Sequence, residues 1–162
     1  LVQALAQNYR LSWELRARTG ATTASTIRHL QSLPRRPYDL VITSLGVNDV
    51  TTAVNRRSWL QQQRDLRNLL RHSFDVRLML ISGLPPIASF PALPQPLRWY
   101  LGSRARDFDC DLERDMDGEA DAVFLSLRFG DVAAMALDGF HPGPAIYSEW
   151  GRRAADIVQA RL

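Results

Sequence analysis

The sequence predicts an α/β domain in which helices cover both faces of a mostly parallel sheet. Three short apolar runs, at residues 40–42, 78–81 and 123–125, are unbroken by polar residues, as expected of parallel strands covered on both sides. Segments with helical periodicity separate these runs, and this alternation favours a parallel sheet. The chain has 162 residues, of which 46% are hydrophobic, enough for one domain with one core. We therefore expect a single domain over residues 1–162.

The N-terminal half of the chain contains two predicted strands and two predicted helices. Leu11, Trp13, Leu15 and Ala17 alternate with polar residues, the period-two pattern of a strand with one solvent-exposed face. This pattern predicts an edge strand at 11–17. The other elements expected in this half are a helix over about 22–33, a strand over 40–45 and a helix over about 55–72.

The C-terminal half repeats the alternation, with predicted strands at 78–82 and 123–125. Two helices are predicted by apolar residues at helical spacing. The first set is Leu101, Ala105, Phe108 and Leu112, and the second is Ile146, Trp150, Ala154 and Ile157. In an open sheet of this kind, ligands bind beyond the carboxyl ends of the strands. The segments expected there are 19–22, 44–49 and 138–142.

Composition excludes several function classes. Cys110 is the only cysteine, so an internal disulfide and a zinc site built from several thiolates are both impossible. The 20 basic residues are all arginines, spread along the chain among acidic residues, and the net charge is only +3. A nucleic-acid-binding domain usually gathers its basic residues into a stripe, so no nucleic-acid partner is expected.

The sequence also bears on membranes and compartment. No apolar stretch approaches the roughly 18 residues of a membrane span, so stable membrane insertion is not expected. The opening LVQALAQNYR lacks the basic start, apolar run and cleavage site of a signal peptide. This favours the cytoplasm, although a signal could precede a chain that begins inside its domain. The sequence gives no indication of the oligomeric state.

His141 is the histidine that best suits catalysis. It lies in a loop between Gly139-Phe140 and Pro142, before the final helix, and Asp138 precedes it by three residues. A carboxylate at this spacing can accept the imidazole Nδ1–H, which leaves Nε2 as a base. The alternative is a helix-capping loop in which both side chains satisfy backbone groups. His29 and His72 fall in amphipathic helices and are interpreted as surface residues.

A second candidate group lies at the ends of the first strands. Asn48 and Asp49 follow a buried strand through Gly46, and an amide there can donate to a developing oxyanion. The alternative is an ordinary turn, because Gly, Asn and Asp are strong turn formers. Gly20 stands at a strand-to-helix junction, which can equally be a simple helix start.

Taken together, these segments resemble conserved blocks of the SGNH (GDSL) hydrolases, in the family's order. Gly20, the segment 46–49 and the segment 138–142 resemble its second, third and fifth blocks, and residues 81–87 resemble the strand and Pro-rich loop between the last two. The resemblance covers essentially the whole chain. It implies a flavodoxin-like three-layer α/β/α sandwich that hydrolyses esters or thioesters without a metal or organic cofactor.

The resemblance also implies roles for individual residues. His141 would be the general base and Asp138 its orienting acid. The backbone N–H of Gly20 and the side-chain amide of Asn48 would donate to the oxyanion, while Asp49 would support the loop that presents Asn48.

One part of the family's pattern is missing from the chain. The family's nucleophile lies in a Gly-Asp-Ser segment after the first strand, and no Gly-Asp-Ser occurs here. We therefore expect the family's first strand and the serine to lie upstream of Leu1, with that strand between residues 11–17 and the strand at 40–45. Ser44 and Ser82 stand near strand ends but outside a strand–turn–helix elbow, so they are weak substitutes.

These features together predict a serine esterase acting on short to medium acyl esters, inactive without the upstream serine. The alternatives are a non-catalytic α/β module that binds small molecules, and a nucleotide-binding flavodoxin-like domain. The sequence contains no Gly-rich phosphate loop, which weakens the nucleotide-binding alternative. The proline-rich stretch 84–90 could wall an acyl pocket beside His141, with Leu84 and Phe90 as its candidates, or could simply close the core.

Overall fold

A computed structural model of the protein describes residues 1–52, 54–128, 136, 138–139 and 141–162. Within these residues three strands, β1 (Tyr38–Ser44), β2 (Val76–Ser82) and β3 (Ala122–Leu125), form a parallel sheet in the order β1-β2-β3. The central strand β2 is buried at six of its seven positions, because neighbours and helices cover both of its faces. The predicted parallel sheet of apolar runs is confirmed.

Helices α1 (Val2–Leu5), α2 (Thr23–Gln31), α3 (Val47–Thr51), α4 (Arg56–Ser73), α5 (Leu97–Asp115) and α6 (Pro144–Arg161) surround the sheet, together with a short 3₁₀ helix, η1 (Ile87–Ser89). The four long helices lie where the sequence predicted them, within about two residues at most ends. Two of them, α2 and α4, have side-chain caps at their starts. Asn55 accepts the backbone N–H of Ser58 at the start of α4, and Thr22 and Ser25 form a capping box at the start of α2.

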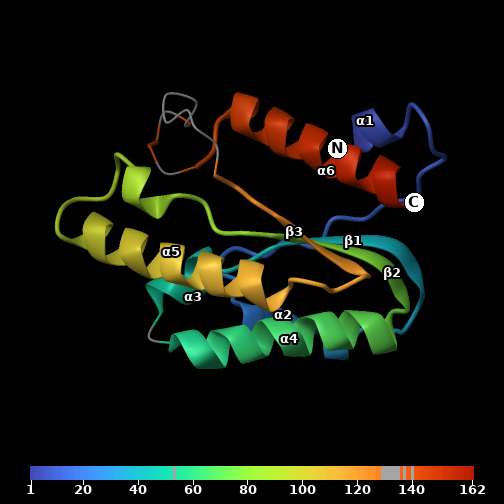
Figure 1. Ribbon diagram of the computed structural model, residues 1–162, viewed down its shortest axis with the longest axis horizontal. Coiled ribbons are helices and arrows are strands. Elements are labelled where there is room, and N and C mark those ends of the chain that lie inside the picture. The colour runs from blue at the N-terminus through green and yellow to red at the C-terminus, as the bar shows by residue number, and fades with distance from the viewer. Residues whose placement is uncertain (53, 129–135, 137, 140) are drawn as a thin grey trace.

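Two apolar cores lie on opposite faces of the sheet, and Figure 1 shows α1 and α6 on one side of the sheet and α4 on the other. On one face, Met79 and Ile81 of β2 pack with side chains of α4 and α5. On the other face, Leu78 and Leu80 pack with side chains of α1 and α6. Alternate residues of one strand thus serve different cores, which makes the domain a three-layer α/β/α sandwich. None of the helices described is long and apolar enough to cross a membrane.

The edge strand predicted at 11–17 is wrong. These residues form no strand, and the Trp13 and Leu15 side chains are 66% and 79% exposed. Glu14 anchors the segment by accepting a hydrogen bond of 2.5 Å from the hydroxyl of Tyr38, the first residue of β1. Hydrogen bonds from Arg16, Tyr38 and Arg36 lower the pKa of Glu14 to about 2. The segment has no backbone partner, and the apolar side chains expected on its covered face are exposed, so neither the pairing nor the burial that a strand needs is present.

Candidate active site

A small cavity opens where β1 and β2 end. Its volume is about 60 Å³. The residues that line it come from three segments: Ala21 before α2, the stretch 44–48 after β1, and Gly83 and Pro85 after β2. The predicted meeting of ligand-facing segments at the carboxyl edge of the sheet therefore holds for the turns after β1 and before α2.

The chain turns sharply into α3 at Gly46, which has a φ of 119°. This conformation suits glycine because a side chain would be strained there. A Cβ at this position would also lie only 3.2 Å from Leu84. The turn places Asn48 in the first turn of α3, facing the start of α2. The sequence left open an oxyanion donor or an ordinary turn here, and the five-residue helix α3 was not predicted.

Asn48 and Asp49 both bind the segment that begins α2. The Asn48 Nδ2 donates to the backbone oxygen of Ala21 at 2.9 Å. The buried carboxylate of Asp49 accepts the backbone N–H and the hydroxyl of Thr23, each at 3.1 Å. Gly20 immediately precedes Ala21 and has a φ of 73°. The structure thus brings the predicted oxyanion donors, Gly20 and Asn48, to the same small region.

Asp138 and His141 form a close pair between β3 and α6. The His141 Nδ1 lies 2.6 Å from Asp138 Oδ2, and the His141 backbone N–H donates to Oδ1 at 2.9 Å. Both side chains are exposed. His29 and His72 are exposed on α2 and α4.

The proline-rich segment after β2 takes a partly different place from the predicted acyl wall. Leu84 and Phe90 are both buried in the main core, and neither is among the residues that line the cavity described. Leu84 instead packs behind the cavity, against Gly46. The contact with the histidine loop is made further along, where the Ala92 N–H donates to the Gly139 oxygen at 3.3 Å. The role of Leu84 and Phe90 in substrate choice stays a prediction.

The two substitute serines differ in their surroundings. Ser82 is buried and its hydroxyl accepts the Trp150 Nε1–H at 3.2 Å, whereas Ser44 is exposed and lines the cavity. Neither begins a helix as a nucleophile elbow requires.

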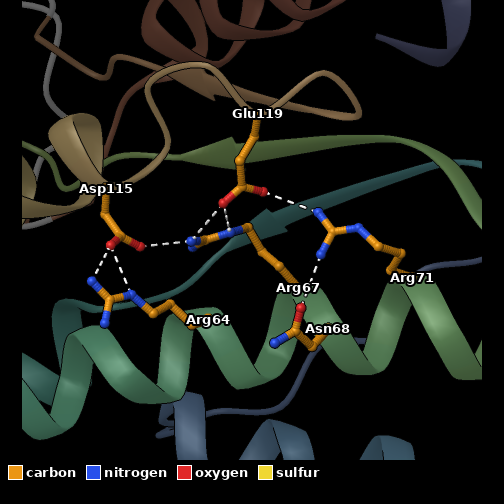
Figure 2. Close-up of a pocket in the computed structure, with 6 residues that line it drawn as sticks. All are labelled: Arg64, Arg67, Asn68, Arg71, Asp115 and Glu119. Atoms are coloured by element: carbon orange, nitrogen blue, oxygen red, sulfur yellow. Dashed lines mark hydrogen bonds and ion pairs between the residues drawn. The ribbon is translucent and has the colours of Figure 1, made fainter.

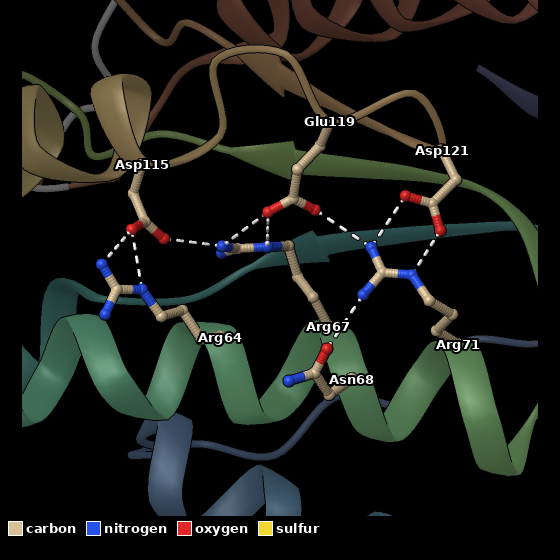
Figure 3. Close-up of polar contacts among 7 residues, drawn as sticks. All are labelled: Arg64, Arg67, Asn68, Arg71, Asp115, Glu119 and Asp121. Carbon is tan, nitrogen blue, oxygen red and sulfur yellow. Dashed lines mark hydrogen bonds and ion pairs between the residues drawn. The ribbon is translucent and has the colours of Figure 1, made fainter.

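A larger hollow of about 240 Å³ lies elsewhere, between α4 and the end of α5. Figure 2 shows that its lining consists of paired charges, with Asp115 and Glu119 reaching toward arginines of α4. Arg67 is the buried centre of this network and pairs with both Asp115 (2.7 Å) and Glu119 (2.9 Å). Figure 3 adds Asp121, which accepts two hydrogen bonds from Arg71. Both carboxylates in its lining are held in ion pairs with arginines of α4, so we interpret the hollow as structural.

No metal centre is visible in the part of the chain that the structure describes, since no three His, Cys, Asp or Glu side chains gather there. Sequence reasoning missed two residues near the site. Thr23 and Gln63 are polar yet fully buried. Gln63 follows Trp59 and precedes Leu66 and Leu70 at helical spacing, so a polar residue on an apolar helical face was the available signal.

The sequence matches the model of the GDSL-like lipase/acylhydrolase family over residues 1–148. No curated protein matches it significantly. The structure resembles a GDSL-like lipase from Bacteroides thetaiotaomicron, with a TM-score of 0.65 and 17% identity, over 86% of this chain and 73% of that one. A protein of Bacteroides fragilis assigned as an acylhydrolase gives a TM-score of 0.63 and 14% identity, over 86% and 72%.

A family two carbohydrate esterase from Clostridium thermocellum, solved in complex with cellohexaose, gives a TM-score of 0.56 and 15% identity. The match covers 76% of this chain and 36% of the esterase. At such identities the likeness shows a shared fold.

Proposed function

Because this chain belongs to the GDSL-like lipase/acylhydrolase family, we propose that it carries the base and oxyanion donors of a serine esterase. The observation that carries the proposal is the pairing of His141 Nδ1 with Asp138 at 2.6 Å. This contact fixes the imidazole tautomer and directs Nε2 away from the carboxylate, as a general base requires. The ordinary family function, ester hydrolysis, needs these parts and no cofactor.

In the proposed reaction a serine upstream of Leu1 attacks the ester carbonyl while His141 Nε2 takes its proton. The tetrahedral intermediate collapses, the alcohol leaves with the proton from His141, and an acyl-enzyme forms. Water then attacks the acyl-enzyme with the same base. His141 then gives this proton to the serine oxygen as the bond between that oxygen and the acyl carbon breaks and the carboxylic acid departs.

The oxyanion of each tetrahedral intermediate would be held by the Gly20 backbone N–H and the Asn48 amide. The Asn48 Nδ2 carries two hydrogens. Its bond to the Ala21 oxygen uses one and fixes the plane of the amide, so the other has a set direction. A donor held in place before the reaction stabilises developing charge without reorganising during it.

The cavity beside Asn48 supports a short acyl group. Its volume of about 60 Å³ is only a few times the roughly 10–15 Å³ that a single buried water needs. A short acyl group fits such a space better than a long one. Acetylated carbohydrates are a second substrate candidate, favoured by the fold shared with the carbohydrate esterase.

The test compares the 162-residue chain with the full-length protein. We expect the full-length protein to hydrolyse p-nitrophenyl acetate and to react with a fluorophosphonate probe. The short chain should do neither above its His141→Ala control, because the remaining base and donors give only residual catalysis.

Two results would contradict the proposal. A full-length protein that neither reacts nor hydrolyses esters would favour a non-catalytic binding module. Robust hydrolysis by the short chain that is lost on Ser44→Ala or Ser82→Ala would place the nucleophile within these residues.

A further inference from the structure

Three polar side chains from three different helices meet beneath the candidate site, out of contact with solvent. Thr23 of α2, Asp49 of α3 and Gln63 of α4 are each at most 1% exposed. Burying polar groups is unfavourable unless they are hydrogen-bonded, so a cluster of this kind indicates a specific arrangement rather than general packing.

The hydrogen bonds in this cluster run in one direction. The Gln63 Nε2 donates to the Thr23 hydroxyl oxygen at 2.9 Å, and the hydroxyl donates to Asp49 Oδ2 at 3.1 Å. A threonine hydroxyl has a single hydrogen. If Gln63 presented its oxygen instead, that hydrogen would have to serve both Gln63 and Asp49. The order from Gln63 through Thr23 to Asp49 therefore follows from the chemistry of the three groups.

Asp49 also lies at the N-terminus of α2, where the backbone N–H of Thr23 donates to both of its oxygens at 3.1 Å. The positive end of a helix favours a carboxylate there. Burial raises the pKa of Asp49, and the hydrogen bonds from Thr23 oppose that rise. The Thr23 hydroxyl is thus one of the groups that keep the carboxylate in place.

This cluster is joined directly to the proposed oxyanion donors. Asn48 precedes Asp49 and binds the oxygen of Ala21, two residues before Thr23. Neighbouring residues of α3 therefore grip the start of α2 at two points. The position of the Asn48 amide relative to Gly20 depends on both.

We propose that Thr23 and Gln63 are positioning residues that hold Asp49, and through it the Asn48 amide, in the geometry for oxyanion binding. The inference rests on the proposed esterase function and extends it to two residues outside the reacting groups. Their effect on rate should pass through Asn48 and should be separable from their effect on stability.

The experiment uses the full-length protein with Thr23→Val, which removes the hydroxyl at nearly constant volume, and Thr23→Ser, which keeps it. Gln63→Leu provides a second test on the neighbouring helix. Gln61→Leu is the matched control, because Gln61 is exposed on α4 and bonds only to Asp65 among its described neighbours. The values of kcat and KM for p-nitrophenyl acetate are measured well below the Tm of each variant. The concentration of active sites is counted by fluorophosphonate labelling, so that kcat refers to folded, reactive protein.

Thr23→Val and Gln63→Leu should lower kcat by about 10-fold to 10²-fold with little change in KM, as small misplacements at an active site do. Thr23→Ser should restore most of the rate, and Gln61→Leu should behave as wild type. In an Asn48→Ala background, Thr23→Val should lower kcat little further, because the donor it positions is already gone.

Equal loss from Thr23→Val in both backgrounds, or a lowered Tm with unchanged kcat per labelled site, would show that the cluster is only structural. Those results leave wild-type hydrolysis and labelling intact, so they overturn this inference alone. A wild-type protein that shows neither hydrolysis nor labelling would overturn the esterase function, and the positioning role with it.

Discussion

Asp138 holds His141 at two points, with one carboxylate oxygen 2.6 Å from the imidazole Nδ1 and the other accepting the histidine's own backbone N–H. The double contact ties the ring orientation to the backbone of the loop. Gly139, with a φ of 65°, makes the turn between them possible. The pair is exposed, so its orientation depends on this local geometry rather than on burial.

Asp138→Asn should lower kcat for p-nitrophenyl acetate by about 10³-fold to 10⁴-fold in the full-length protein, because an amide favours the wrong imidazole tautomer. Steady-state kinetics with His141→Ala as the baseline would measure the loss. A kcat for Asp138→Asn within about tenfold of the wild-type value would mean that Asp138 only shapes the loop.

Asn48→Ala should lower kcat by about 10²-fold to 10³-fold and change KM little, because the amide is needed most when the oxyanion forms. Asn55→Ala is the matched control. Asn55 caps α4 through the backbone N–H of Ser58, so its loss should reduce stability by about 1 kcal/mol without changing kcat. Similar kcat values for the two variants would contradict the oxyanion assignment.

Ester chain length should show how large the acyl site is. With a cavity of about 60 Å³, kcat/KM should be highest for acetate or propionate esters and fall toward hexanoate. Phe90 is 3% exposed within the core. Phe90→Ala should cost about 3–5 kcal/mol of stability and leave the acetate-to-hexanoate ratio unchanged per labelled site. A selective change for hexanoate would restore Phe90 to the acyl wall that the sequence indicated.

Arg67 should contribute far more to stability than an exposed arginine does. Its side chain is 3% exposed and pairs with Asp115 and Glu119. Arg67→Ala should lower the free energy of unfolding by about 3–5 kcal/mol, because a buried pair loses one partner. Arg77→Ala, which breaks an exposed pair with Asp39, should cost less than about 1 kcal/mol. Urea unfolding of both variants gives the comparison.

The same network should make the fold sensitive to acid. Hydrogen bonds from Arg64 and Arg67 outweigh burial and lower the pKa of Asp115, and those from Arg71 lower the pKa of Asp121. Both carboxyls therefore stay ionised in the folded protein at a pH where the unfolded chain, with Asp pKa values of about 3.9, takes up protons. Their contribution is complete above that value and is lost as the pH falls through the folded pKa values.

Urea unfolding at a series of acidic pH values measures this loss. Arg71→Ala should reduce the dependence on pH, and Arg77→Ala should leave it unchanged. A wild-type free energy of unfolding that stays constant through this range would contradict the assignment.

The sequence predicted the sheet well because buried parallel strands need continuous apolar runs, and residues 78–81 have one. It failed at residues 11–17, since the alternation of Leu11, Trp13 and Leu15 is accompanied by neither a backbone partner nor burial of these side chains. Helix α3 is too short to show a periodicity. The link from Gln63 to Asp49 joins residues far apart in the chain, so pattern alone could not supply it.

Gly46 also decides which positions can be mutated to change the acyl chain length that the cavity accepts. Its backbone and the nearby Leu84 side chain exclude a larger residue at position 46, so mutant libraries at that position should yield almost nothing. The productive target is Leu84, whose isobutyl group stands behind the glycine. Leu84→Ala would deepen the cavity toward the core, at about 2–5 kcal/mol of stability. The Gly46 turn would keep its shape while the space left by the Leu84 side chain became available to longer acyl chains.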